Sequence, residues 1–192
     1  MRVWTWIRAL TLLAFAVALL GVGSGCGSDV QSESAAVPAL NDTPAAQPAE
    51  RSENAVPEFA LQDLDGRTVH LSDFAGKAVF LNFWATWCPP CKAELPDLVE
   101  VQKKYGGDEF VIVGISLDRT GPAKVQAFVQ QAGLNYPILM GNEQVVAAYG
   151  NFTGIPTSFL LNPRHEAVRQ YTGMITKAQL VHDLEGVLNQ ST

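Results

Sequence analysis

The sequence contains little cysteine, little histidine and fewer basic than acidic residues. Three cysteines in 192 residues are too few for a disulfide-rich scaffold or a four-cysteine zinc site, and the three histidines, His70, His165 and His182, are scattered. A formal net charge of −6 argues against non-specific nucleic-acid binding, because affinity for phosphates comes from Lys and Arg. The hydrophobic share of 47% is that of a globular protein rather than a disordered one.

The segment 1–25 is typical of a secretory signal. Arg2 and Arg8 make a basic start, residues 9–20 are apolar, and small residues follow. Because no charge occurs between residue 9 and residue 28, an uncleaved membrane anchor of about 20 residues is the alternative. Cleavage is favoured, since the last third of that charge-free span is rich in Gly and Ser.

Cys26 directly follows the small residues, in a pattern that resembles a bacterial lipobox. In proteins with this motif the cysteine is lipidated and becomes the mature N-terminus. Gly23 departs from the pattern, in which Leu is commonest. The alternative is a chance cysteine near an ordinary signal-peptidase site, but a stray free thiol in an exported protein would be prone to oxidation. We therefore expect a lipoprotein anchored to a membrane of the cell envelope, on the periplasmic or extracytoplasmic side.

Residues 26–55 are predicted to form a flexible tether. Between Gly27 and Asn54 the chain has no aromatic residue and three prolines. Such a segment cannot bury enough apolar area to offset its conformational entropy. Aromatic and β-branched residues return from Val56, so residues 56–192 are expected to fold as one domain.

Strand-like and helix-like patterns alternate along this domain. Two short apolar segments flank Asp65-Gly66, which predicts a hairpin. Residues 78–84 and 110–116 are continuous apolar runs, typical of strands buried on both faces. Further strands are expected at 136–139, 157–161 and 167–171, and helices at 90–105, around 125–132, at 143–149 and after Thr176. This order predicts an α/β fold with a mixed sheet.

The sharpest motif is Trp87-Cys88-Pro89-Pro90-Cys91, between a buried strand and a predicted helix. A thiol at a helix N-terminus lies near unpaired N–H groups and the positive end of the helix dipole, which favour the thiolate. A thiolate attacks disulfides, and a cysteine three residues later can resolve the mixed disulfide. Half of a zinc site and a purely structural disulfide are the alternatives. Zinc would lack further ligands, and a disulfide that closes so small a loop adds little stability.

The stretch FWATWCPPCKAELP resembles the active-site signature of thioredoxin-like proteins. More narrowly, it is similar to that of the TlpA/ResA family of membrane-tethered thiol-disulfide oxidoreductases. The resemblance covers about residues 57–189 and includes GIPTSFLLNP. It implies a thioredoxin fold, in which helices flank a mixed central sheet, with an N-terminal β-hairpin and a central βα insertion. It also implies that Cys88 is the nucleophile and Cys91 the resolving cysteine, with no cofactor.

The same resemblance implies a substrate-binding surface around the two cysteines. Ile155 and Pro156 match the loop whose proline is cis and packs against the disulfide, and an ordinary trans proline is the alternative. The backbone beside this proline would pair with an extended segment of the substrate. Trp87 and Pro89 are expected to contribute to the same surface.

Two residues, Asn82 and Glu94, bear on how protons are transferred at the cysteine pair. Asn82 stands where thioredoxin has a buried Asp, and an amide cannot take over that proton transfer. Glu94, three residues after Cys91, matches a Glu that in the ResA-like group tunes the cysteines and helps to move protons. The alternative for Glu94 is a solvated carboxylate in the first turns of the helix.

These features predict an exported, membrane-anchored thiol-disulfide oxidoreductase. The resemblance implies that it reduces disulfides in exported proteins, among them apocytochrome c before haem attachment, and that a membrane protein supplies the electrons. A thiol peroxidase is one alternative, because residues 110–118 resemble peroxiredoxins, although Ala85 stands where those proteins have Thr. A copper-delivery module, in which the two cysteines bind a soft metal, is the other.

Overall fold

The computed structural model of the chain describes residues 55–190. The predicted signal of residues 1–25, Cys26 and all but the last residue of the predicted tether lie outside the described residues. Among the helices of the described part, none is long and apolar enough to cross a membrane. The domain predicted from residue 56 is described almost to its end.

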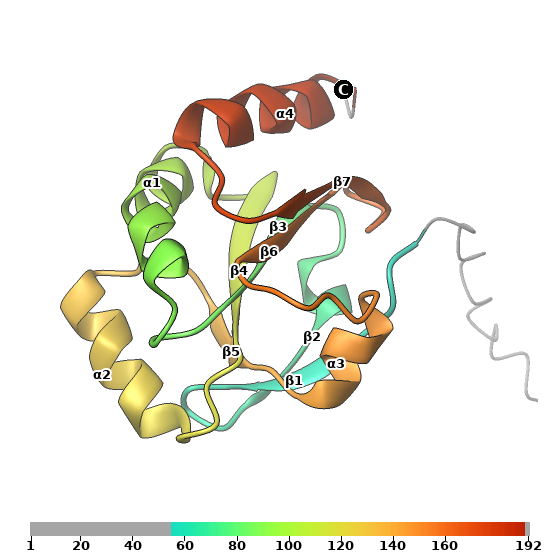
Figure 1. Ribbon diagram of the computed structural model, residues 1–192. Helices are drawn as coiled ribbons and strands as arrows, with labels where there is room; N and C mark the ends of the chain where they lie inside the picture. The colour runs from blue at the N-terminus through green and yellow to red at the C-terminus, as the bar shows by residue number, and fades with distance from the viewer. Residues whose placement is uncertain (1–54, 191–192) are drawn as a thin grey trace, which may run out of the picture. The chain divides into compact units, whose positions relative to one another are not determined.

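A seven-stranded mixed sheet forms the centre of this domain, in the order β2-β1-β5-β4-β3-β6-β7 (Figure 1). Its middle strands, β3 (Ala78–Trp84) and β4 (Phe110–Ser116), pair in parallel and are buried along their full length. Their bounds match the two continuous apolar runs, because a strand covered on both faces needs no polar alternation. β6 (Thr157–Leu161) pairs antiparallel with β3, and β7 (Ala167–Thr172) pairs antiparallel with β6.

The predicted central insertion consists of β5 (Ile138–Met140) and α3 (Glu143–Ala148). β5 begins two residues later than the predicted strand at 136–139. The reason is that pairing with β4 starts at Ile138, directly after Pro137, which has no N–H to donate. The side chain of Asn142 accepts a hydrogen bond from the N–H of Val145 and so caps α3.

The predicted N-terminal hairpin extends the sheet beyond β5. β1 (Ala60–Asp63) and β2 (Thr68–His70) pair antiparallel on either side of Gly66. Gly66 has a φ of 83°, a conformation that glycine adopts without strain. β1 also pairs antiparallel with β5. The hairpin therefore adds two strands to the sheet at the edge formed by β5.

The helices form two layers, one on each face of the sheet (Figure 1). α1 (Pro89–Tyr105), α2 (Pro122–Ala132) and α4 (Lys177–Asn189) bury their apolar residues on one face. α3 and the short 3₁₀ turn η1 (Leu71–Phe74) pack on the other. The hydroxyl of Thr176 accepts a hydrogen bond from the N–H of Gln179, so the predicted cap of α4 is confirmed. The thioredoxin fold implied by the resemblance is confirmed, including the hairpin and the insertion.

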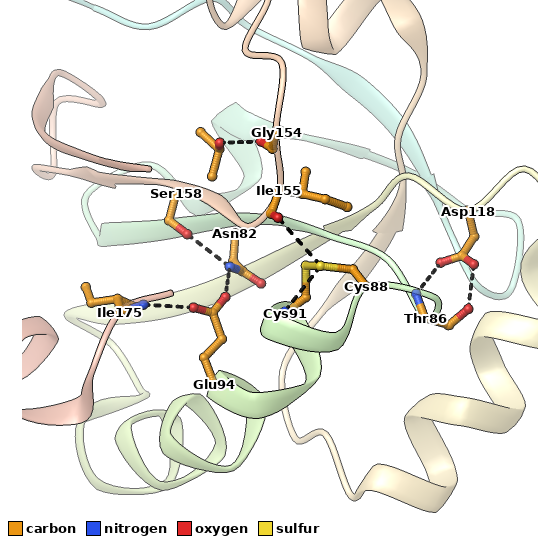
Figure 2. Close-up of a disulfide and its surroundings, with 11 residues drawn as sticks. Asn82, Thr86, Cys88, Cys91, Glu94, Asp118, Gly154, Ile155, Ser158 and Ile175 are labelled. Atoms are coloured by element: carbon orange, nitrogen blue, oxygen red, sulfur yellow. Dashed lines mark hydrogen bonds between the residues drawn. A yellow bond between two sulfur atoms is a disulfide. The ribbon is translucent and has the colours of Figure 1, made fainter. Parts of the chain in front are cut away.

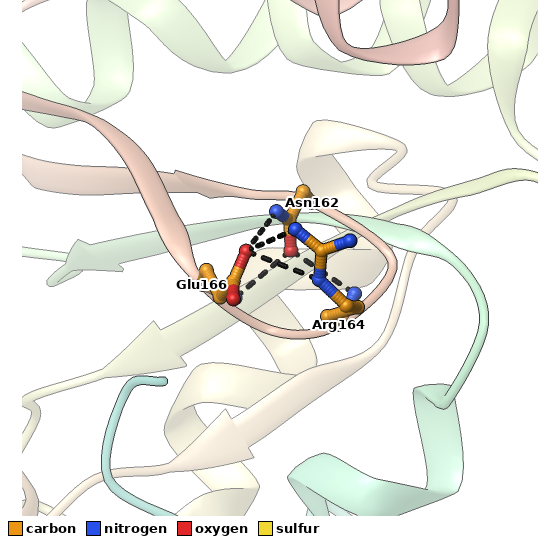
Figure 3. A network of polar contacts seen from close by, with 3 residues as sticks. All are labelled: Asn162, Arg164 and Glu166. Atoms are coloured by element: carbon orange, nitrogen blue, oxygen red, sulfur yellow. Dashed lines mark hydrogen bonds and ion pairs between the residues drawn. The ribbon is translucent and has the colours of Figure 1, made fainter. Parts of the chain in front are cut away.

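A polar network fixes the predicted turn between β6 and β7, which begins at Asn162 (Figure 3). The side-chain oxygen of Asn162 accepts the N–H groups of Arg164 and Glu166. The carboxylate of Glu166 accepts a bond from the Asn162 amide and pairs with Arg164 at 2.9 Å. His165 in this turn is half-buried, and a ring nitrogen lies 3.2 Å from the carbonyl oxygen of Phe74.

Gly114 occupies a position in β4 where a side chain does not fit. A Cβ there would lie 2.6 Å from Ile138 Cδ1 and 3.0 Å from Trp84 Nε1.

We expect Gly114→Ala to lower the free energy of unfolding by about 1–3 kcal/mol in urea denaturation, the usual cost of overpacking a core. Gly186→Ala in α4 is the matched control, since a Cβ there meets nothing within 4 Å. Gly186→Ala should stabilise the helix by up to about 1 kcal/mol. If both variants lowered the free energy of unfolding by similar amounts, the tight packing at Gly114 could not be the cause.

Candidate active site

The Cys88–Cys91 pair lies where β3 leads into α1. The two sulfur atoms form a disulfide, and the Cα atoms are 5.3 Å apart. Cys88 is the N-cap residue of α1, and its Sγ accepts a hydrogen bond from the N–H of Cys91 at 3.2 Å. Pro89 and Pro90 occupy the first helical positions, where a missing N–H costs little. The predicted position at a helix N-terminus is confirmed, and the N–H directed at Cys88 would stabilise a thiolate there.

Cys88 borders a surface cleft, whereas Cys91 is inaccessible. Cys88 is 3% exposed and Cys91 is 0% exposed. The cleft has a volume of about 440 Å³, and its walls include Trp87, Pro89 and Ile155. Trp87 is 64% exposed at the edge of the cleft. The structure therefore brings the residues predicted to bind substrate together around Cys88, and only Cys88 lies within reach of an incoming sulfur atom.

The loop before β6 lies against the disulfide. The Ile155–Pro156 peptide bond is cis, as predicted, and the trans alternative is wrong. The carbonyl oxygen of Ile155 lies 3.6 Å from Cys88 Sγ (Figure 2). The hydroxyl of Thr157 donates to the carbonyl oxygen of Gly154 at 2.7 Å and ties the loop to the start of β6. Pro156 is buried, and Ile155 is half-exposed on the cleft.

Glu94 is buried one helical turn after Cys91, with an exposed fraction of 1%. Asn82 Nδ2 donates to Oε1 of Glu94 at 2.7 Å, and the N–H of Ile175 donates to Oε2 at 3.0 Å (Figure 2). Burial raises the pKa of Glu94 to about 7, although the bonds from Ile175 and Asn82 favour the charged form. The alternative of a solvated carboxylate is wrong. A carboxyl group with this pKa gains and loses its proton near neutral pH, as proton transfer requires.

Asn82 positions the Glu94 side chain. Besides its bond to Glu94, Asn82 Nδ2 donates to Ser158 Oγ in β6 at 2.9 Å. Sequence reasoning identified Asn82 only as a departure from thioredoxin and missed Ser158 and Ile175. Nothing in the sequence distinguishes these two, because one is an ordinary strand serine and the other contributes only its backbone N–H.

A second buried carboxylate, which sequence reasoning also missed, holds the loop before Cys88. Asp118 lies just beyond the end of β4 and is buried. Thr86 donates to it through its N–H at 2.8 Å and its hydroxyl at 2.6 Å, and the hydroxyl of Ser116 donates at 2.9 Å. Its position could have identified it, since residues beyond the carboxyl ends of neighbouring parallel strands gather at one edge of a sheet.

We expect Asp118→Ala to destabilise the domain by about 2–3 kcal/mol, because three hydrogen bonds to a buried charge are lost. Asp118 also fixes the loop that carries Thr86, so the variant should react more slowly at Cys88. Urea denaturation of the oxidised protein measures the first effect. Asp108→Ala, at an exposed position, is the control and should change stability by less than about 0.5 kcal/mol. An Asp118→Ala variant as stable as this control would refute the structural role of Asp118.

The described part of the chain shows no metal site. Within residues 55–190, no group of three or more His, Cys, Asp or Glu side chains is placed to hold a metal ion. The arrangement around the disulfide combines a sulfur at the edge of a cleft, a buried sulfur and a buried carboxyl group.

The chain is similar to one protein-family model, to known proteins and to solved structures. The model of the AhpC/TSA family matches residues 53–186. The thiol-disulfide oxidoreductase ResA of Bacillus thuringiensis (strain Al Hakam) is 40% identical over 137 residues, which are 71% of this chain and 76% of the relative. The crystal structure of a thiol:disulfide interchange protein from Chlorobium tepidum TLS is similar at 31% identity and a TM-score of 0.65, over 70% of this chain and 96% of that one. The exposed lipoprotein thioredoxin of Streptococcus pneumoniae strain TIGR4 is similar at 30% identity and a TM-score of 0.57, over 68% and 99%.

Proposed function

Because this chain belongs to the AhpC/TSA family and, within it, to the ResA-type thiol-disulfide oxidoreductases, we propose that it is an exported, membrane-anchored enzyme that reduces disulfides in partner proteins. The observation that carries the proposal is the Cys88–Cys91 pair itself. One sulfur borders a cleft, the other is buried behind it, and both lie at the start of a helix. Disulfide exchange needs this division between an attacking and a resolving cysteine.

The reaction proceeds in two exchanges. The thiolate of Cys88 attacks one sulfur of the partner disulfide, so a mixed disulfide forms and the second partner sulfur leaves as a thiolate, which takes up a proton. Cys91 loses its proton and attacks Cys88 Sγ, so the Cys88–Cys91 bond forms and the mixed disulfide breaks. Two electrons pass from the enzyme dithiol to the partner, which is released with two thiols.

Glu94 is the group that accepts the proton of Cys91 in the second exchange. It lies one helical turn from Cys91, and burial raises its pKa to about 7. A base with a pKa close to the ambient pH is largely ionised yet still binds the proton well. Asn82 and Ile175 hold its two oxygen atoms, so the carboxylate keeps one orientation during the reaction.

The export of the protein, its membrane anchor and the direction of its disulfide exchange are inferred from the sequence and the relatives. Residues 1–25 have the pattern of a secretory signal, and Cys26 lies where a lipobox places its lipidated cysteine. One similar structure is that of an exposed lipoprotein. Compartments outside the cytoplasm are oxidising, so a reductase there needs electrons from another protein, for which a membrane dithiol carrier is the expected donor.

Apocytochrome c is the proposed partner class, because its haem-attachment site is a CxxCH motif that must be reduced before haem can bind. A synthetic peptide with a disulfide-bonded CxxCH motif tests this. The reduced full chain should reduce the peptide faster than an otherwise identical peptide in which the two cysteines are separated by ten residues. If the enzyme reduces insulin but neither peptide, the oxidoreductase activity stands and the partner class is wrong.

The lipid anchor has its own test. In a bacterial host, the wild-type chain should be found in the membrane fraction and become labelled with a fatty-acid probe. Cys26→Ala should abolish the label. If Cys26→Ala kept the label, or if the wild type never acquired it, the lipid anchor at Cys26 would be refuted. The proposed redox activity would not be affected.

A thiol peroxidase is the second candidate, because residues 110–118 resemble peroxiredoxins. The geometry near Cys88 argues against it. Ala85 stands where peroxiredoxins have a threonine, and it is fully buried with only a methyl side chain. A methyl group cannot hydrogen-bond a peroxide oxygen. Turnover of hydrogen peroxide by the purified chain, at a rate that depends on Cys88, would favour this second candidate over the first.

A further inference from the structure

A second cleft continues the one at Cys88. It has a volume of about 810 Å³, and three residues, Trp87, Leu117 and Val146, line both clefts. Trp87 directly precedes Cys88 in the chain and is 64% exposed, so its indole is open to a molecule that lies along the two clefts. The two clefts therefore form one groove, which begins at Cys88.

The walls of this groove change from apolar to charged along its length. Leu117 directly follows β4, and Arg119 lies two residues further along the same loop. Val146 is on α3, and Glu143 lies three residues earlier, on the same side of the helix. Arg119 and Glu143 line the second cleft and not the first. On each wall, the apolar residue is shared with the first cleft, and the charged residue lies at the far end.

An ion pair joins the two walls at the far end of the groove. Arg119 Nη2 lies 3.1 Å from Glu143 Oε1, and the two side chains are 87% and 91% exposed. An exposed pair of this kind contributes little to stability, because water screens both charges. Little free energy is therefore needed to separate Arg119 from Glu143, and a charged side chain of a bound protein can take the place of one of them.

Carboxylates outnumber basic groups at this end of the groove. Asp118 lines the second cleft next to Arg119, and it is buried. The donors that hold its oxygen atoms are uncharged, namely the N–H and hydroxyl of Thr86 (Figure 2) and the hydroxyl of Ser116. None of the ion pairs within residues 55–190 includes Asp118. The lining thus contains two carboxylates and one guanidinium, so the second cleft attracts a basic side chain and repels an acidic one.

We propose that the second cleft binds a lysine or arginine side chain of the partner protein, which displaces Arg119 and pairs with Glu143. The inference rests on the proposed function, because it extends the path of the partner segment whose cysteine Cys88 attacks. A cleft of about 440 Å³ is roughly 8 Å across, and an extended chain advances about 3.3 Å per residue, so the basic residue lies about two to four residues from that cysteine. The aliphatic stem of the basic side chain packs on the exposed indole of Trp87. Glu143 therefore selects the partner, while the chemistry remains with Cys88 and Cys91.

Peptides with a single cysteine test the preference for a basic residue. The cysteine is disulfide-bonded to thionitrobenzoate, whose coloured thiolate is released when Cys88 attacks the peptide sulfur atom. Three versions carry lysine, glutamine or glutamate at the third position on both sides of the cysteine. With the reduced full chain at low salt, and relative to the rates with dithiothreitol, the lysine peptide should react about 5-fold faster than the glutamine peptide, and the glutamate peptide more slowly than either. Equal relative rates for the three peptides would overturn the proposal.

Two substitutions at the ion pair separate charge recognition from general effects on the fold. Glu143→Lys should reverse the order, so that the glutamate peptide reacts fastest, a result that a loosened fold would not give. Arg119→Gln removes the side chain that competes for Glu143, and it should increase the preference for lysine. Glu109→Gln, at an exposed position at the opposite end of β4 from Arg119, is the matched control and should keep the wild-type order. Glu143→Lys with the wild-type order, Arg119→Gln with a smaller preference for lysine, or a control that lost the preference would each contradict the role of Glu143.

Binding is measured separately from the exchange reaction. In the oxidised full chain, the indole N–H signal of Trp87 should shift on titration with a lysine peptide in which serine replaces the cysteine, and it should shift less with the glutamate version. The difference should shrink between about 0.05 M and about 0.5 M salt, since exposed charges are screened. Equal shifts with the two peptides at low salt would overturn the proposal. If the wild type attacked none of the disulfide peptides, the proposed function would be refuted, whereas the Trp87 signal would still decide whether the second cleft binds a basic residue.

Discussion

Replacing Cys88 by serine is expected to abolish the reduction of insulin disulfides above the rate of dithiothreitol alone. Cys88 Sγ is the sulfur that borders the cleft, whereas Cys91 is fully buried. A serine hydroxyl is not ionised near neutral pH and cannot form a mixed disulfide, so the whole enzyme-dependent rate is lost. The turbidity of precipitating insulin B chain, at matched enzyme concentrations, measures the effect.

Two further variants make this result specific. Cys26→Ala also removes one cysteine, but one that precedes the described residues and the matched family region, and it should retain the full rate. Cys91→Ala should still attack once and then stop, because the mixed disulfide is not resolved. If Cys88→Ser kept the wild-type rate, or if Cys26→Ala lost it, the assignment of the nucleophile would be wrong.

The stability of the oxidised protein should fall as the pH rises from about 5 to about 8, through Glu94. Burial raises the pKa of Glu94 from 4.5 to about 7 in the folded state. Between these values the folded protein binds a proton that the unfolded chain has released, so folding is favoured at the lower pH and loses this advantage as the pH rises. At about 1.4 kcal/mol for each pH unit, the loss amounts to about 3 kcal/mol. Urea denaturation at pH 5 and pH 8 measures it.

Glu94→Gln should remove this pH dependence. The amide has no titratable proton, so this position should contribute no change of stability between pH 5 and pH 8 in the variant. Glu100→Gln, on the exposed side of α1, is the control and should keep the wild-type pH dependence. If Glu94→Gln showed the same decrease between pH 5 and pH 8 as the wild type, the raised pKa of Glu94 could not be its cause.

The strands that the sequence predicted best are those buried on both faces. β3, β4 and β6 have the predicted bounds. β3 and β4 are continuous apolar runs that end where the chain leaves the core. The two prolines that follow Cys88 indicate the start of α1, and the predicted start at residue 90 is one residue from the observed start at Pro89. β5 was misplaced by two residues at its start, since a strand of three residues carries little pattern and its bounds depend on the partner strand.

The sequence predicted the reacting cysteines but not the network that surrounds them. A CxxC motif is local, and its position between a strand and a helix is enough to predict its chemistry. The site of Glu94 combines β3, α1, β6 and the loop before α4, which are far apart in the sequence. Without the fold, nothing distinguished a buried Glu94 from a solvated one. Asp118 was missed for the same reason, because its importance comes from what it contacts.

Mass spectrometry of the mixed disulfide is the most direct test of the account. The reduced Cys91→Ala chain is mixed with a short peptide disulfide, quenched with acid and digested. We expect one peptide half to be covalently attached to Cys88, with the other half released as a thiol. Attachment at Cys26 instead, or no adduct at any cysteine, would contradict the claim that this chain exchanges disulfides through Cys88.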